Sequence, residues 1–104
     1  MSYFKNSSLR RNSSFIMITA YTLFSGSSGN CTYVTSGKTE ILIDAGKSCL
    51  AIEKALNALG TSLSGISDIF VTHEHSDHTC GLEVISKKYN IPVHFAYPPL
   101  TALS

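Results

Sequence analysis

The pattern of apolar and polar positions along the chain predicts alternating strands and helices. Short runs rich in apolar, aromatic and β-branched residues predict strands at about residues 18–24, 31–35, 39–43, 69–71 and 91–95. Apolar residues that recur at helical spacing predict helices at about residues 49–59 and 79–89. Because a strand, a helix and a further strand follow one another, we predict an α/β fold with a right-handed crossover.

Capping and turn residues at the ends of these segments support the assignment. Ser48 can cap the first turn of the helix at 49–59, and Gly60 ends that helix. Residues 36–38 are typical of the turn of a β-hairpin. The run at 41–43 is apolar throughout, which is typical of a strand covered on both faces.

Residues 1–16 differ from the rest of the chain. Most of this segment is polar and aperiodic and carries no acidic side chain, so we expect a disordered extension. Met17 offers a second start, which leaves residues 17–104 as the folded part. Residues 100–104 are expected to begin a further helix, and neither an internal repeat nor a second domain is evident.

A secretory signal is the alternative interpretation of the N-terminus. A basic segment precedes an apolar run at residues 15–24 and small residues at 25–29. Thr19, Tyr21 and Thr22 interrupt that run and favour a strand instead. No stretch approaches the roughly 20 apolar residues of a membrane span. We therefore expect a soluble, cytoplasmic protein.

The overall composition excludes some classes of function. The chain has 104 residues, of which 43% are hydrophobic, as in an ordinary globular protein. A net charge of +1 offers no electrostatic case for nucleic acid or a membrane, so such a partner must be argued from the site. Cys31, Cys49 and Cys80 match neither a zinc knuckle nor a disulfide framework, which favours a reducing cytosol. Cys80 is either a small buried residue that opens a helix or a soft metal ligand.

Four potential metal ligands lie directly after the strand at 69–71, namely His73, His75, Asp77 and His78. Side chains two positions apart in an extended backbone point the same way, so His73 and His75 can hold one ion. Asp77 and His78 are adjacent and diverge, which lets them serve a second ion. Imidazole and carboxylate ligands suit zinc, with manganese an alternative. The zincin pattern HExxH is excluded, because its fifth position is occupied by Asp77.

A loop rich in serine and glycine, at residues 25–30, follows the first predicted strand. It is either a tight connection between neighbouring strands or a backbone loop that faces a ligand. In the second case Ser25, Ser27, Ser28 and Asn30 would lie on the substrate side. A phosphate-binding P-loop is excluded, because no Gly-Lys-Ser or Gly-Lys-Thr sequence follows.

Two further residues have open interpretations. Asp44 directly follows the predicted strand at 39–43, where a carboxylate is a turn former, a helix cap or a functional residue. His94 lies in the last predicted strand. A histidine there is more often a surface residue or a hydrogen-bonded core residue than a ligand.

The histidine motif resembles the HxHxDH signature of the metallo-β-lactamase-fold hydrolases, with all four defined positions occupied. Residues 41–46 resemble the strand and aspartate segment that precedes this signature. Three segments are together similar to the YycJ/WalJ-like branch, at residues 25–31, 71–78 and 87–93. The resemblance covers about residues 17–96.

This resemblance implies a fold and a mechanism. The fold would be the N-terminal half of an αββα sandwich, with a mixed sheet that carries its helices on one face. His73 and His75 would bind one zinc ion and Asp77 and His78 a second, while Asp44 would support the metal-binding loop without binding an ion. A hydroxide that bridges the ions would attack the substrate, with Asp77 as the catalytic residue. The branch implies hydrolysis of phosphodiester bonds in DNA by an exonuclease-like reaction.

The chain departs from the family in length. Family members are longer and carry further ligands in later motifs, a histidine, a bridging aspartate and a last histidine, whereas this chain stops at Ser104. We therefore expect the truncated N-terminal part of the domain, with open metal sites and exposed apolar surface at residues 41–43. Two alternatives stay open, namely an inactive metal-binding fragment and a thioester or lactam hydrolase of the same fold.

Overall fold

The computed structural model describes residues 5–6, 9–11 and 14–97, with side chains for residues 17–97. In chain order the elements are β1 (Lys5–Asn6), β2 (Leu9–Arg11), β3 (Ser14–Ile16), β4 (Thr19–Phe24), β5 (Cys31–Thr35), β6 (Glu40–Ile43), α1 (Cys49–Ala58), the 3-10 turn η1 (Leu63–Gly65), β7 (Asp68–Val71), α2 (Ser76–Thr79), α3 (Leu82–Tyr89) and β8 (Val93–Phe95). The helix predicted at residues 100–104 lies outside the described residues.

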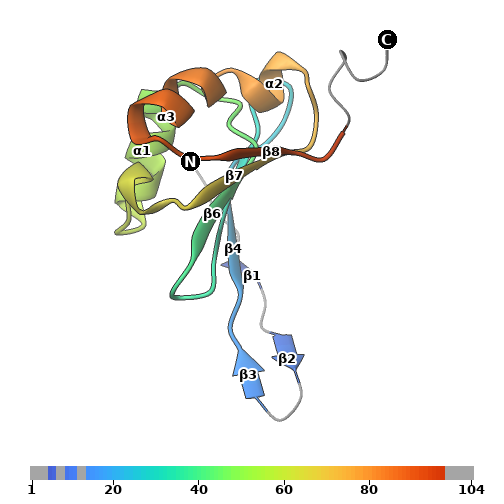
Figure 1. Ribbon diagram of the computed structural model, residues 1–104, viewed down its shortest axis with the longest axis vertical. Coiled ribbons are helices and arrows are strands. Elements are labelled where there is room, and N and C mark those ends of the chain that lie inside the picture. Colours follow the sequence, from blue (N-terminus) through green and yellow to red (C-terminus); the bar gives the residue numbers. More distant parts are fainter. Residues whose placement is uncertain (1–4, 7–8, 12–13, 98–104) are drawn as a thin grey trace.

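The strands form a mixed six-stranded sheet in the order β1-β4-β5-β6-β7-β8, and β2 pairs with β3 in a separate two-stranded sheet. Neighbours from β1 to β6 are antiparallel. Neighbours from β6 to β8 are parallel. Helix α1 lies between β6 and β7 in the chain, and α2 and α3 lie between β7 and β8 (Figure 1). This arrangement confirms the predicted α/β fold with a mixed sheet.

One face of the sheet carries the helices. Leu42 and Ile69 of the central strands are fully buried and belong to one core cluster with Ile52 of α1. Successive side chains of a strand point to opposite faces. The neighbouring Ile43 is accordingly only half-buried, and Phe70 is 41% exposed. The second face is therefore apolar and partly open to solvent within the described part of the chain, as the sequence predicts.

Helix α1 begins and ends where its capping residues predict. The Ser48 hydroxyl accepts a hydrogen bond from the backbone N–H of Ala51 at 3.2 Å, which confirms Ser48 as the N-cap. Gly60 has a φ of +85°, a left-handed conformation in which glycine avoids the strain of a side chain. None of the helices within the described residues combines the length and the hydropathy needed to cross a membrane.

The helix predicted at residues 79–89 is confirmed from Leu82 to Tyr89 as α3, but its predicted start is wrong, because Cys80 and Gly81 separate α3 from the short helix α2. The Gly81 N–H donates to the Ala45 carbonyl oxygen at 2.8 Å and so leaves the helical pattern. A side chain at Gly81 would also overlap the Lys47 carbonyl oxygen. The chain is thus held against a neighbouring loop at this point, and α2 and α3 end and begin on either side of it.

The N-terminal segment contains short strands. Strand β1 pairs with β4, and β2 pairs with β3 as an antiparallel hairpin. The sequence predicts a disordered extension over residues 1–16 and a fold over residues 17–104. This division of the chain stays a prediction.

Truncating a buried leucine of the central sheet is expected to destabilise the fold. Leu42→Ala should lower the free energy of unfolding by about 2–5 kcal/mol, because Leu42 is fully buried and the mutation leaves a cavity. Leu50→Ala is the matched control, since Leu50 is 65% exposed and should change stability by less than about 0.5 kcal/mol. Urea unfolding followed by circular dichroism measures both. Equal losses for the two variants would contradict the burial pattern.

Candidate metal centre

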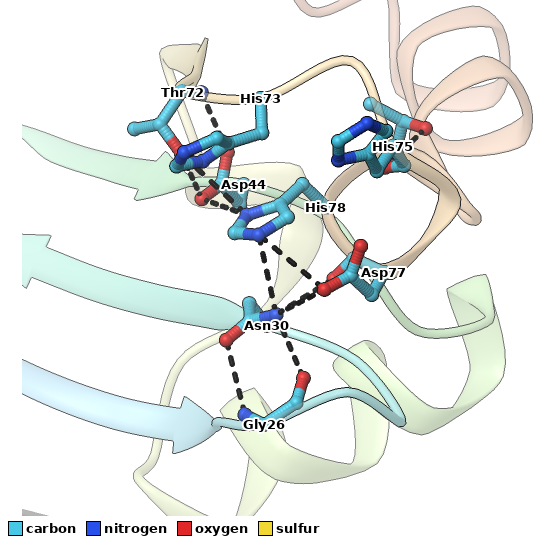
Figure 2. Close-up of polar contacts among 9 residues, drawn as sticks. Gly26, Asn30, Asp44, Thr72, His73, His75, Asp77 and His78 are labelled. Carbon is cyan, nitrogen blue, oxygen red and sulfur yellow. Dashed lines mark hydrogen bonds and ion pairs between the residues drawn. The ribbon is translucent and has the colours of Figure 1, made fainter.

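Three loops meet at the edge of the sheet where β4, β6 and β7 end. They are the serine-glycine loop (residues 25–30), the Asp44 loop (residues 44–48) and the histidine loop (residues 72–78). Strands β6 and β7 are parallel, and β4 runs in the same direction because β5 is antiparallel to both β4 and β6. The carboxyl ends of these strands therefore bring candidate residues from distant parts of the chain together, as Figure 2 shows.

Backbone hydrogen bonds tie the three loops to one another. The Asn30 N–H donates to the Asp77 carbonyl oxygen at 2.7 Å, and the Gly46 N–H donates to the Asn30 carbonyl oxygen at 2.9 Å. The Ala45 N–H donates to the His78 carbonyl oxygen at 2.9 Å. Gly46 has no room for a side chain, because a Cβ there would overlap the Asp77 carbonyl oxygen. The loops are thus packed backbone against backbone, which fixes the positions from which their side chains extend.

Asp44 is the buried charged residue at the centre of these loops, with 5% of its surface exposed. Its Oδ1 accepts the Thr72 N–H at 2.7 Å, and its Oδ2 accepts the Thr72 hydroxyl at 2.6 Å. The same Oδ2 lies 2.7 Å from His78 Nδ1. The backbone of Asp44 is left-handed, with a φ of 66°, a conformation that aspartate adopts in turns. Asp44 is therefore both a turn residue and the anchor of the histidine loop.

His78 is held by Asp44 in an orientation that suits a metal ligand. Because the carboxylate accepts, the imidazole donates from Nδ1, and Nε2 is the ring atom that faces Asp77 and the Asn30 amide. His78 Nε2 lies 3.5 Å from Asp77 Oδ2. Two donor atoms held at about 2.1 Å from one tetrahedral zinc ion would be about 3.4 Å apart. The Asp77 and His78 donors therefore fit a single ion.

His73 lies beside His78, with ring centroids 4.4 Å apart. Ligand atoms of Asp44, His73 and His78 all fall within 4.8 Å of one another, and they form a candidate metal-binding group. His75 is exposed at the N-cap of α2, and Figure 2 shows its ring apart from the His73 and His78 pair. The chain bends at Thr72 and at His75, and the backbone of His75 is extended, with φ of −70° and ψ of 154°. That pairing on one ion stays a prediction.

Two ionisable groups near Asp44 remain protonated at neutral pH. Burial, together with the charge of Asp44, raises the pKa of the Cys31 thiol well above its usual range. Desolvation and the charges of Glu74 and Asp44 raise the pKa of the Tyr97 hydroxyl. Cys31 is buried, and the candidate metal-binding group among the described residues consists of Asp44, His73 and His78. Cys80 is exposed at the end of α2, so its predicted burial is wrong.

The serine-glycine loop presents exposed hydroxyls and one engaged amide. Ser25, Ser27 and Ser28 are exposed, in agreement with a surface that a substrate can reach. Asn30 is half-buried, and its side chain is bonded within its own loop and to Asp77 (Figure 2). The substrate-side role of these four residues stays a prediction.

Two contacts of the centre were not predicted from the sequence. Thr72 donates two hydrogen bonds to Asp44, yet a threonine at the end of a strand is common and carries no signal of its own. The Asn30 side chain contacts Asp77 across 47 positions of sequence. Neither contact is visible before the strands are paired, because each joins residues that are distant along the chain.

The sequence of the chain is similar to one protein family and to several curated proteins. Residues 25–101 match the family model described as the metallo-beta-lactamase superfamily. The chain is 44% identical over 72 residues to the exodeoxyribonuclease YycJ of Bacillus anthracis, and 39% identical over 72 residues to the exodeoxyribonuclease WalJ of Streptococcus pneumoniae serotype 2. Each alignment covers 69% of this chain and 27% of the relative.

The fold is also similar to that of a solved structure. A beta-lactamase from Chitinophaga pinensis superposes with a TM-score of 0.62 at 21% sequence identity, over 71% of this chain and 28% of that protein. The chain thus spans about a quarter of the length of the curated relatives it matches. Because the family model covers more than half of the chain, the protein belongs to the metallo-beta-lactamase superfamily.

Proposed function

We propose that this chain contributes the metal-binding loop of a hydrolase that cleaves phosphodiester bonds in DNA. The observation that carries the proposal is the arrangement of His78, whose Nδ1 is held 2.7 Å from Asp44 and whose Nε2 lies 3.5 Å from Asp77 Oδ2. A carboxylate that fixes one ring nitrogen while the other faces a second donor is the usual environment of a histidine that binds a metal. A packing role alone would not require both ring nitrogens to face carboxylate groups.

The donor set suits zinc, with manganese as an alternative. We assign His73 and His75 to one ion and Asp77 and His78 to a second. A bound zinc ion would lower the pKa of a coordinated water and polarise a phosphoryl oxygen. Asp44 holds the His78 ring in place. We assign the catalytic role to Asp77, because its carboxylate is 31% exposed and lies at the surface beside the His78 ring.

The DNA substrate is supported by the relatives from Bacillus anthracis and Streptococcus pneumoniae serotype 2, both of which are named exodeoxyribonucleases. The exposed hydroxyls of Ser25, Ser27 and Ser28 lie on a loop that packs against the histidine loop, so we assign this loop to the substrate side. The net charge of +1 adds no general attraction for DNA. Specific binding would therefore depend on contacts at the centre.

We further propose that residues 17–104 are the N-terminal part of a metallo-β-lactamase-like domain, preceded by the extension at residues 1–16. A sheet with helices on one face and a half-exposed apolar second face supports a partial domain, and strand β1 of the extension pairs with β4 of the same sheet. The coverage of 27% of each relative supports an alternative for the isolated chain, namely that it binds metal without hydrolysing a substrate.

Removal of the His78 imidazole is expected to weaken metal binding. His78→Ala should raise the dissociation constant for Zn²⁺ by more than roughly 10-fold, because it removes a donor and leaves the Asp44 carboxylate without its partner. His94→Ala is the matched control, since His94 is exposed and bonded to Asp68 at 2.7 Å rather than to any candidate ligand. Competition with a chromophoric chelator measures both affinities. Equal affinities for the two variants would rule out His78 as a ligand.

Hydrolysis distinguishes the two functional hypotheses. The hydrolase hypothesis predicts that the purified chain, supplied with Zn²⁺ or Mn²⁺, shortens end-labelled linear DNA, leaves a closed circular strand intact and loses activity on chelation. His75→Ala should abolish this activity. The alternative predicts metal binding without cleavage of either DNA. A chromogenic β-lactam or a thioester serves as the comparison substrate, and its hydrolysis in place of DNA would contradict the proposed substrate.

A further inference from the structure

The side-chain amide of Asn30 lies between the serine-glycine loop and the histidine loop. Its Nδ2 donates to the Gly26 carbonyl oxygen at 2.9 Å and to the Asp77 carbonyl oxygen at 3.1 Å. The same nitrogen lies 3.3 Å from Asp77 Oδ2 and 3.5 Å from His78 Nε2. Figure 2 shows these contacts converging on the amide nitrogen. The two N–H groups of the amide are closest to the two carbonyl oxygens, and the N–H that bonds Asp77 is shared between its carbonyl oxygen and Oδ2, beside His78 Nε2.

Contacts within the loop determine which end of the amide faces Asp77. The Gly26 N–H donates to Asn30 Oδ1 at 3.1 Å, while the Gly26 carbonyl oxygen accepts from Nδ2. Turning the amide over would place its oxygen against the carbonyl oxygens of Gly26 and Asp77, and its nitrogen against the Gly26 N–H, so that acceptors would face acceptors and a donor would face a donor. The nitrogen therefore points to Asp77, and the contact is a hydrogen bond from an amide to a carboxylate.

Asn30 holds Asp77 at two places. Its backbone N–H donates to the Asp77 carbonyl oxygen at 2.7 Å, and its side chain contacts both that oxygen and Oδ2. A carboxylate that binds a metal is usually held by a hydrogen bond from a neighbouring group, which orients it for the ion. Within the part of the chain from residue 14 to residue 97, Asn30 supplies that donor.

We propose that Asn30 is a positioning residue whose amide holds the Asp77 carboxylate beside His78 and thereby sets the affinity of the centre for a divalent metal ion. This inference rests on the proposed function, in which Asp77 and His78 bind metal. Under this inference the Asn30 amide acts on Asp77, and its predicted place on the substrate side stays a prediction. The exposed serines of the loop remain the candidates for substrate contact.

Two substitutions separate the role of the donor from the role of the loop. Asn30→Ala removes the whole amide. Asn30→Asp keeps an oxygen that can accept the Gly26 N–H but places a second oxygen against Asp77 Oδ2, where like charges repel. Asn57→Ala is the matched control, because Asn57 is exposed on α1. Circular dichroism of each metal-free variant reports whether the fold is retained, and Asn30→Asp carries the test if Asn30→Ala does not fold.

The measurement is a titration of the full 104-residue chain with Co²⁺, followed by its visible absorption, and then displacement by Zn²⁺. Both Asn30 variants should bind roughly 10-fold to 100-fold more weakly than the wild type and show an altered Co²⁺ spectrum. Asn57→Ala should bind as the wild type does. Unchanged affinity in both folded Asn30 variants, or tighter binding by Asn30→Asp, would overturn the inference.

A double-mutant cycle tests whether Asn30 acts through Asp77. In the Asp77→Ala background, the Asn30 substitution should cause no further loss of metal affinity, because the group that it positions is absent. A full additional loss would show that Asn30 acts elsewhere and would overturn the inference. A wild-type chain that binds no Co²⁺ would overturn the proposed function as well. Unchanged metal affinity in the Asn30 variants, with normal binding by the wild type, would overturn only the role of Asn30.

Discussion

The buried carboxylate of Asp44 organises the centre. It lies at the end of a core strand, where an ionised group without partners would be costly, and it receives the Thr72 N–H, the Thr72 hydroxyl and the His78 ring. These hydrogen bonds satisfy the charge and at the same time bring two ends of the histidine loop to one point. The orientation of His78 is therefore a consequence of satisfying Asp44.

The direction of the strands explains why Asp44 lies within reach of the histidine loop. Strands β6 and β7 are parallel, so the Asp44 loop and the histidine loop leave the sheet at the same edge. Parallel pairing requires a crossover, and α1 provides it while covering one face of the sheet. The serine-glycine loop reaches the same edge because β4 runs alongside through two antiparallel pairings. The centre thus depends on strand pairing as much as on ligand chemistry.

Close packing of the loops limits their freedom. Gly46 and Gly81 lie where a Cβ would overlap a neighbouring carbonyl oxygen, so the backbones approach as closely as hydrogen bonds require. The gap between α2 and α3 follows from this packing, because the Gly81 N–H donates to the Ala45 carbonyl oxygen in the Asp44 loop. A short α2 separate from α3 places Asp77 and His78 over Asn30 and Asp44.

Local sequence patterns determined many of the helices and strands of this protein and its candidate metal ligands. Helix α1 and its Ser48 cap, strand β5 and the strands on either side of α1 follow from periodicity and capping chemistry, which act over a few residues. The four candidate ligands are also evident, because their residue types lie close together in the chain. The tertiary structure alone decided that helix 79–89 would be interrupted and that Asn30 would contact Asp77. Both outcomes depend on hydrogen bonds between loops that are distant in sequence, and such bonds form only once the sheet has brought those loops together.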